Sequence, residues 1–142
     1  MSLELDSIAV EPNLAQEGVW ADFLGGRFLL ARRGHEYNAR LGHLYNENLA
    51  AIKDKTNPEV SAKKVLEIYQ RAFADTVIKD WEGITRGGVP LPFSPDEAFK
   101  ILSDPRQAEL SQFLEQFSLN HGNYQAVVEA EIAHDVKSSA VS

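Results

Sequence analysis

An apolar stripe between residues 57 and 82 constrains the fold of this chain more than any other feature of its sequence. Its large side chains recur at three- and four-residue steps, the spacing of one helix face: Val65, Leu66, Tyr69, Phe73, Val77 and Trp81. Asn57 can cap such a helix, and Pro58 suits its first position. The pattern predicts a central core helix to about residue 82, with these four side chains largely buried: Leu66, Tyr69, Phe73 and Val77.

Residues 18–33 are predicted to form a β-hairpin, because Gly25-Gly26 can supply the positive φ of a two-residue turn. This turn would pair Phe23 with Phe28 and Ala21 with Leu30. Side chains alternate across a strand, which divides the hairpin into two faces. One face holds Val19, Ala21, Phe23, Phe28 and Leu30, and the other holds Trp20, Asp22, Leu24, Arg27, Leu29 and Ala31. Residues 3–10 are considered as a third, short strand.

Further helices are predicted over 35–53, from 95 to about 102, from 105 to about 119, and over 124–136. Ser94 and Asp104 each precede a proline and have Glu or Gln three residues on, which is typical of a capping box. The 142 residues, 44% hydrophobic and 25% charged, suit one globular core. We therefore expect a mainly α fold, a single small helical domain over 1–136 with a short N-terminal β-hairpin at about 18–33. Residues 137–142 are expected to form a disordered tail.

The net charge of −7 argues against a nucleic-acid partner, which normally requires a strongly basic face. The charge is uneven, since residues 23–79 carry ten bases and six acids while residues 1–22 carry five acids and no base. Such segregation suits self-association or a charged protein partner, although an unevenly charged solvated surface explains it equally well. No segment is apolar for long enough to span a membrane, and the N-terminus does not resemble a signal peptide. The absence of cysteine excludes disulfides and thiolate chemistry and fits a reducing cytosol.

The sequence contains no constellation typical of an enzyme, a metal site or a cofactor site. His35-Glu36 lacks the second histidine of the zinc-protease pattern, and Glu131 with His134 lacks the second copy that a di-iron bundle requires. No serine lies in a nucleophile elbow, and no phosphate-binding glycine loop is present. We therefore expect no catalytic, metal-binding or cofactor-binding residues. A small acid–base enzyme using Asp80, Glu82 and His134 is kept as a less favoured alternative.

The second face of the predicted hairpin is the candidate protein-binding surface. A small helical domain can cover only one face of a two-stranded hairpin, and the face with Val19, Phe23 and Phe28 is the more apolar. The opposite face would then present Trp20 and Leu29 beside the cations Arg27, Arg32 and Arg33, residue types enriched at binding hot spots. The alternatives are that these arginines only keep a strand edge soluble, and that the N-terminal segment covers Trp20.

The order of several segments resembles the tail assembly chaperones of long-tailed, lambda-like, non-contractile bacteriophages. The matching segments are the hairpin at 18–32, the tyrosine-bearing helix from Tyr37, the Val-Ile-Lys-Asp-Trp-Glu-Gly stretch at 77–83, and the Pro-Leu-Pro-Phe-Ser stretch at 90–94 with the Ile-Leu-Ser-Asp-Pro stretch at 101–105. The resemblance covers about residues 18–124 and is carried by the order of the segments.

This resemblance implies a morphogenetic function and no catalytic residues. Proteins of this kind are mainly helical, oligomerise, coat the tape-measure protein and help recruit tail-tube subunits. They act in the cytoplasm of the host bacterium and are absent from the mature virion. The alternative within the same class is another phage structural protein, such as a head–tail connector, which would remain in the particle.

Overall fold

The computed structural model describes residues 1–54 and 56–125. Within them the helices are α1 (Pro12–Glu17), α2 (His35–Glu47), α3 (Leu49–Ile52), α4 (Pro58–Thr76), α5 (Pro95–Leu102) and α6 (Ala108–Leu119). The strands are β1 (Val19–Phe23), β2 (Gly26–Leu30), β3 (Ile78–Glu82), β4 (Thr85–Arg86) and β5 (Val89–Pro90). Short 3-10 turns lie at Leu5–Ser7, Pro105–Gln107 and His121–Tyr124. Residues 126–136 of the last predicted helix and the predicted tail lie outside the described residues.

The predicted fold class is wrong, because β-structure continues beyond the N-terminal hairpin. Strands β1, β2 and β3 form an antiparallel sheet in the order β1-β2-β3, and β4 pairs with β5 in a small hairpin. The third strand lies where the sequence predicted the last turns of the central helix. The protein is therefore a helical domain built around a three-stranded sheet, and the short strand considered at residues 3–10 does not form.

The central helix stops at Thr76 because the next residues complete the sheet. The Thr76 hydroxyl donates to the Ala72 carbonyl at 2.7 Å inside the helix, and Ile78 then begins β3. Pairing with β3 satisfies the backbone groups on the outer edge of β2, which a longer helix would leave unpaired. Trp81 is buried, as the predicted stripe requires, but it lies on strand β3 and not on a helix. Its indole N–H donates to the Leu91 carbonyl at 2.7 Å.

The hairpin turns one residue earlier than predicted, at Leu24-Gly25. Ala21 pairs with Phe28, and Phe23 pairs with Gly26. The register therefore differs by two residues from the predicted one, and a shift of two leaves the side chains within the two strands on their predicted faces. Leu24 and Ala31, also assigned to the second face, lie instead in the turn and beyond the end of β2. Gly26 is the first residue of β2, and the position leaves no room for a side chain because a Cβ there would lie 2.6 Å from Cδ1 of Ile84.

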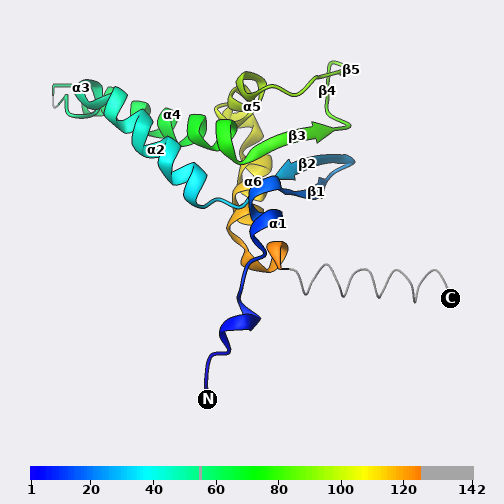
Figure 1. Ribbon diagram of the computed structural model, residues 1–142. Coiled ribbons are helices and arrows are strands. Elements are labelled where there is room, and N and C mark those ends of the chain that lie inside the picture. Colours follow the sequence, from blue (N-terminus) through cyan, green and yellow to red (C-terminus); the bar gives the residue numbers. More distant parts are fainter. Residues whose placement is uncertain (55, 126–142) are drawn as a thin grey trace.

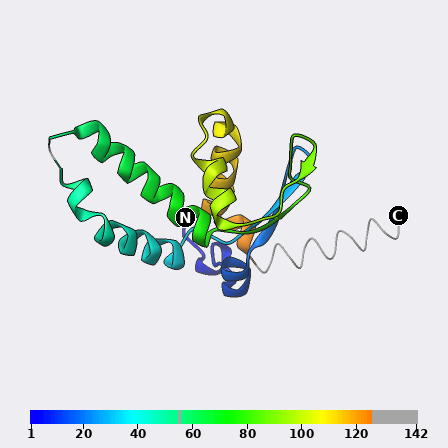
Figure 2. The same cartoon turned by 90° about the horizontal axis from the view of Figure 1, so that it is seen from above.

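The helical elements are arranged as an arm and a body. Helices α2, α3 and α4 form an arm that extends away from the sheet, whereas α5 and α6 stand beside the sheet (Figures 1 and 2). Ser94 caps α5 by accepting from the Glu97 N–H at 3.1 Å, and Asn57 caps α4, both as predicted. The core lies where the base of the arm meets the sheet and α6, around Phe28, Leu30 and Leu114.

Candidate functional site

The structure brings together three of the five predicted binding residues on the outer face of the sheet. Trp20 is directly opposite Leu29 in the β1–β2 register, and the Arg27 guanidinium lies 4.1 Å from the centre of the Trp20 ring. Nε of Arg27 is also 3.5 Å from a carboxylate oxygen of Glu82 on β3. All three side chains are half-buried. We name Trp20, Leu29 and Arg27 the sheet patch.

Arg32 and Arg33 lie elsewhere, because the chain leaves the sheet after Leu30. Arg33 forms an ion pair with Glu115 on α6 at 2.6 Å, and its guanidinium lies 4.5 Å from the centre of the Tyr37 ring. Arg32 lines a separate cavity between α1 and the start of α2. The short distance along the sequence suggested that Arg27, Arg32 and Arg33 form one cationic patch. Side chains alternate between the two faces only within a strand, and Arg32 and Arg33 lie beyond the end of β2.

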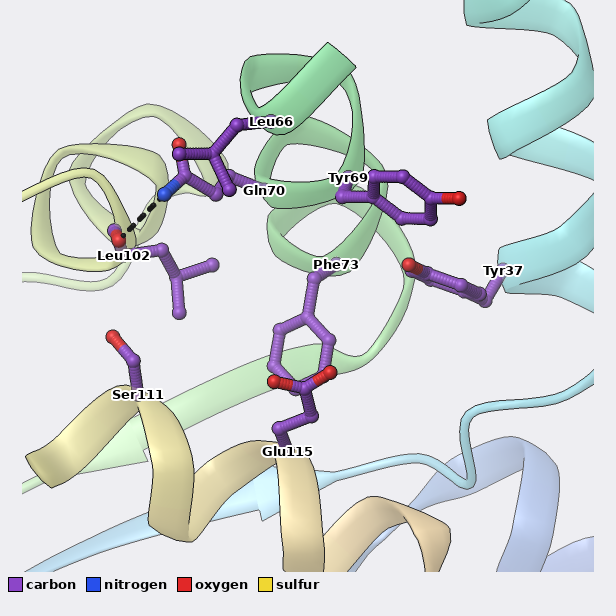
Figure 3. Close-up of a pocket in the computed structure, with 8 residues that line it drawn as sticks. All are labelled: Tyr37, Leu66, Tyr69, Gln70, Phe73, Leu102, Ser111 and Glu115. Carbon is purple, nitrogen blue, oxygen red and sulfur yellow. Dashed lines mark hydrogen bonds between the residues drawn. The ribbon is translucent and has the colours of Figure 1, made fainter. Parts of the chain in front are cut away.

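A second candidate surface is an open groove between α4 and the pair α5–α6, with a volume of about 260 Å³ (Figure 3). We name it the α4 groove. Its lining comes from α2, α4, α5 and α6: Tyr37, Leu66, Tyr69, Gln70, Phe73, Leu102, Ser111 and Glu115. Phe73 lies deepest on α4 and packs edge-on against Tyr37, with ring centres 6.4 Å apart. The Gln70 amide donates to the Leu102 carbonyl at 3.0 Å and ties α4 to the end of α5.

The prediction that four residues of the central stripe are buried is half wrong. Phe73 and Val77 are buried, but Leu66 is 56% exposed and Tyr69 is 38% exposed. The reason is length, since α5 has only eight residues and its last one, Leu102, reaches Gln70 of the 19-residue α4. Tyr69 instead packs edge-on against Tyr45 of α2, with ring centres 6.2 Å apart. The sequence signal for this groove was a stripe longer than the short helix predicted from 95 to about 102.

The chemistry of the α4 groove is that of a binding site. Burial raises the pKa of the Tyr37 hydroxyl, and the nearby Arg33 guanidinium opposes this by a smaller amount, so the phenol stays neutral at physiological pH. Glu115 is engaged by Arg33 at the rim. The Ser111 hydroxyl is buried at the floor without a hydrogen-bond partner among the described residues. An apolar side chain flanked by a polar group would satisfy this lining.

Two of the three residues of the alternative acid–base site, Asp80 and Glu82, lie on β3 with structural partners. Asp80 accepts from the Trp81 N–H at 2.8 Å, and Glu82 contacts Arg27. Across residues 1–54 and 56–125, no group of three or more His, Asp or Glu side chains is placed to hold a metal ion. Glu131 and His134 lie outside the described residues.

No helix in the described part of the chain has the length and apolar character needed to cross a bilayer.

Comparisons with known proteins identify one family. No curated protein matches the sequence, and no solved structure matches the fold. Residues 33–135 match the family described as YdaY prophage protein. That match spans α2 to α6, including the whole α4 groove and β3, and well over half of the sequence, so this chain belongs to the YdaY prophage protein family.

Proposed function

We propose that this prophage protein is a tail assembly chaperone that binds the tape-measure protein and helps recruit tail-tube subunits during tail morphogenesis. It acts in the host bacterial cytoplasm, self-associates, has no catalytic activity and is absent from the finished particle. Membership of a prophage protein family supports a phage function. The order of segments over about residues 18–124 supports the more specific assignment, through its similarity to tail assembly chaperones.

The α4 groove is the observation that carries this proposal. A groove between helices with apolar residues on both walls is typical of sites that receive one face of an amphipathic helix. Leu66 and Tyr69 expose apolar surface there although they belong to the best-patterned helix of the chain. Exposed apolar surface of this kind, rimmed by Glu115 and Arg33, is what a protein needs to shield an apolar partner before assembly.

The rigidity of the groove favours recognition of a partner over non-specific adhesion. The Gln70–Leu102 hydrogen bond, the Arg33–Glu115 ion pair and the Tyr37–Phe73 packing fix its walls from four helices. A preorganised site loses less conformational entropy on binding. We therefore propose that the tape-measure protein binds in the α4 groove. An apolar side chain of that partner would pack against Leu66 and Tyr69.

The test is co-expression with the tape-measure protein encoded by the same prophage. The wild-type chain should keep that protein in the soluble fraction and co-purify with it. The variant Leu66→Ser should fold normally, because Leu66 is 56% exposed, yet it should lose most of the co-purification. Val89→Thr is the matched control, because Val89 is also exposed (65%) but lies on β5, outside the groove. Equal recovery with the groove variant and the wild type would refute the groove as the binding site.

A second measurement distinguishes a chaperone from a component of the virion. Mass spectrometry of purified particles after prophage induction should detect the tail-tube protein and the tape-measure protein but not this chain. Recovery of this chain in stoichiometric amounts would overturn the proposal and favour a connector protein.

A further inference from the structure

The two edge strands of the three-stranded sheet differ in whether their outward-pointing backbone groups have hydrogen-bond partners. At the β3 edge, the Asp80 carboxylate accepts from the backbone N–H of Trp81, and the Trp81 indole is tied to Leu91. At the β1 edge, the two-residue turn places Phe23, Ala21 and Val19 in hydrogen-bonded pairs with β2, so the backbone groups of Trp20 and Asp22 point outward. No backbone hydrogen bond to these outward groups is present within residues 1–54 and 56–125. The β1 edge is therefore open where the β3 edge is capped.

We infer that the β1 edge binds the β1 edge of a second copy of this chain, in antiparallel pairing centred on Ala21. The two sheets would then join into one sheet of six strands. In this arrangement Trp20 of one copy is opposite Asp22 of the other, and each pair exchanges N–H and C=O groups. A two-fold axis at Ala21 makes every contact occur twice, as an isologous interface requires.

Charge and shape favour a second copy over an unrelated extended peptide. Asp22 is exposed, and the pairing brings its carboxylate to the Trp20 of the other copy, whose ring lies under the Arg27 guanidinium. Opposite charges thus meet twice across the axis. On the inner face, half-buried Val19 of one copy is opposite half-buried Phe23 of the other, which forms an apolar cross-strand pair. β1 is therefore complementary to itself in backbone, charge and apolar contact.

The contact is short, so the association should be weak and depend on concentration. β1 has five residues, well below the extent of a standard stable interface. The inference deepens the self-association included in the proposed function, and it involves a surface separate from the α4 groove. A failure at β1 therefore leaves tape-measure binding untouched, and the reverse also holds.

Sedimentation velocity of the full chain over a range of concentrations tests the inference. The wild type should shift from monomer towards dimer as concentration rises. Asp22→Pro removes the outward N–H that the fold itself does not use, and proline is tolerated on an edge strand. It should weaken dimerisation by about tenfold or more, since two hydrogen bonds are lost across the axis. Asp22→Thr keeps the N–H and removes only the charge, so it should weaken dimerisation by no more than about fivefold.

Hydrogen exchange provides a second measurement that requires no variant. The amide protons of Trp20 and Asp22 should exchange more slowly as the wild-type concentration rises, whereas amides of the β4–β5 hairpin should not change. A wild type that stays monomeric at every concentration overturns both the pairing and self-association. A dimer that Asp22→Pro leaves intact, with the Trp20 amide unprotected, overturns only the β1 interface. Protection that appears only when the tape-measure protein is added would assign the edge to that partner and overturn the second copy.

Discussion

Tyr124 is the residue that joins the end of the described chain to the sheet. Its side chain is fully buried, and its hydroxyl lies 3.1 Å from the Leu30 carbonyl and 3.2 Å from the Ala31 carbonyl. Burial raises the pKa of Tyr124 far above the ordinary tyrosine value of about 10. The folded protein therefore favours the neutral phenol, whose hydroxyl holds the last 3-10 turn, His121–Tyr124, against the end of β2.

We expect Tyr124→Phe to lower the free energy of unfolding by about 1 kcal/mol at pH 7, because one buried hydrogen bond is lost. The deficit should shrink as pH rises above about 10. Above that pH the unfolded wild type releases the Tyr124 proton while the folded protein keeps it, so the free energy of unfolding of the wild type falls as pH rises. The variant has no hydroxyl at position 124, so its stability does not show this fall. Urea unfolding at pH 7 and at the highest pH where the protein stays folded measures both values. A deficit that grows with pH would contradict the assignment.

Phe73 and Leu66 share a stripe but differ in burial, so their truncations should differ in effect. Phe73→Ala should cost about 3–5 kcal/mol of stability, the range for a core aromatic residue. Leu66→Ala should cost less than about 1 kcal/mol, since more than half of this side chain is exposed. Chemical denaturation of both variants is the measurement. Similar costs would mean that the α4 groove is closed in solution.

At the scale of elements, the hairpin turn contains a local conflict. Leu24 adopts a φ of +48° and is 91% exposed, at the first position of a turn that normally takes Asn, Asp or Gly. A left-handed conformation costs a non-glycine residue on the order of 1–2 kcal/mol. Nothing in the described contacts of Leu24 offsets this cost.

Leu24→Asn should therefore stabilise the protein by about 0.5–1 kcal/mol, because asparagine tolerates the left-handed region. A thermal melt should show an increase of a few degrees in Tm. Asp22→Asn, which leaves the turn unchanged, is the control and should have little effect. A lower Tm for Leu24→Asn would mean that Leu24 makes a contact in solution that holds the turn.

At the scale of the whole molecule, an ion-pair network ties the arm to the body. Asp75 on α4 accepts from Arg40 on α2 at 3.0 Å and from Arg71 one turn away at 2.7 Å. Arg71 also contacts Asp96 at the start of α5, at 2.9 Å. The hydrogen bond to Asp75 is the main reason that the pKa of Arg71 is raised. Helices α2 and α4 thus meet at the partly buried Asp75 carboxylate, and Arg71 links it to α5.

Asp75→Asn should lower the free energy of unfolding by about 1–2 kcal/mol, since it removes a charge that two arginines share in a partly buried setting. The loss should be smaller at high salt, where the network is screened. Lys64→Gln is the matched control, because it breaks a pair with Glu67 on the same helix that is more accessible to solvent than Asp75, and it should cost less than about 0.5 kcal/mol. Equal effects of the two variants would show that the network does not hold the arm.

The sequence alone determined the features that depend on neighbours along the chain. The caps at Asn57 and Ser94 were predictable because the capping residue and the N–H it serves lie three residues apart. The helices of α2, α4, α5 and α6 followed from periodicity, as did the two faces of the hairpin, which survived an error of one residue in the turn. The burial of Phe73 followed from its place in the stripe.

Tertiary structure alone decided the features that depend on distant partners. Residues 77–82 carry apolar side chains at a spacing that fits either a helix or a bulged strand, and the unpaired edge of β2 selected the strand. The predicted cluster of arginines does not form, because the chain leaves the sheet after Leu30. Arg33 pairs with Glu115, and Arg32 lines a separate cavity. Leu66 and Tyr69 stayed exposed because α5 ends at Leu102, beside Gln70, and a local pattern holds no information about how far a distant helix extends.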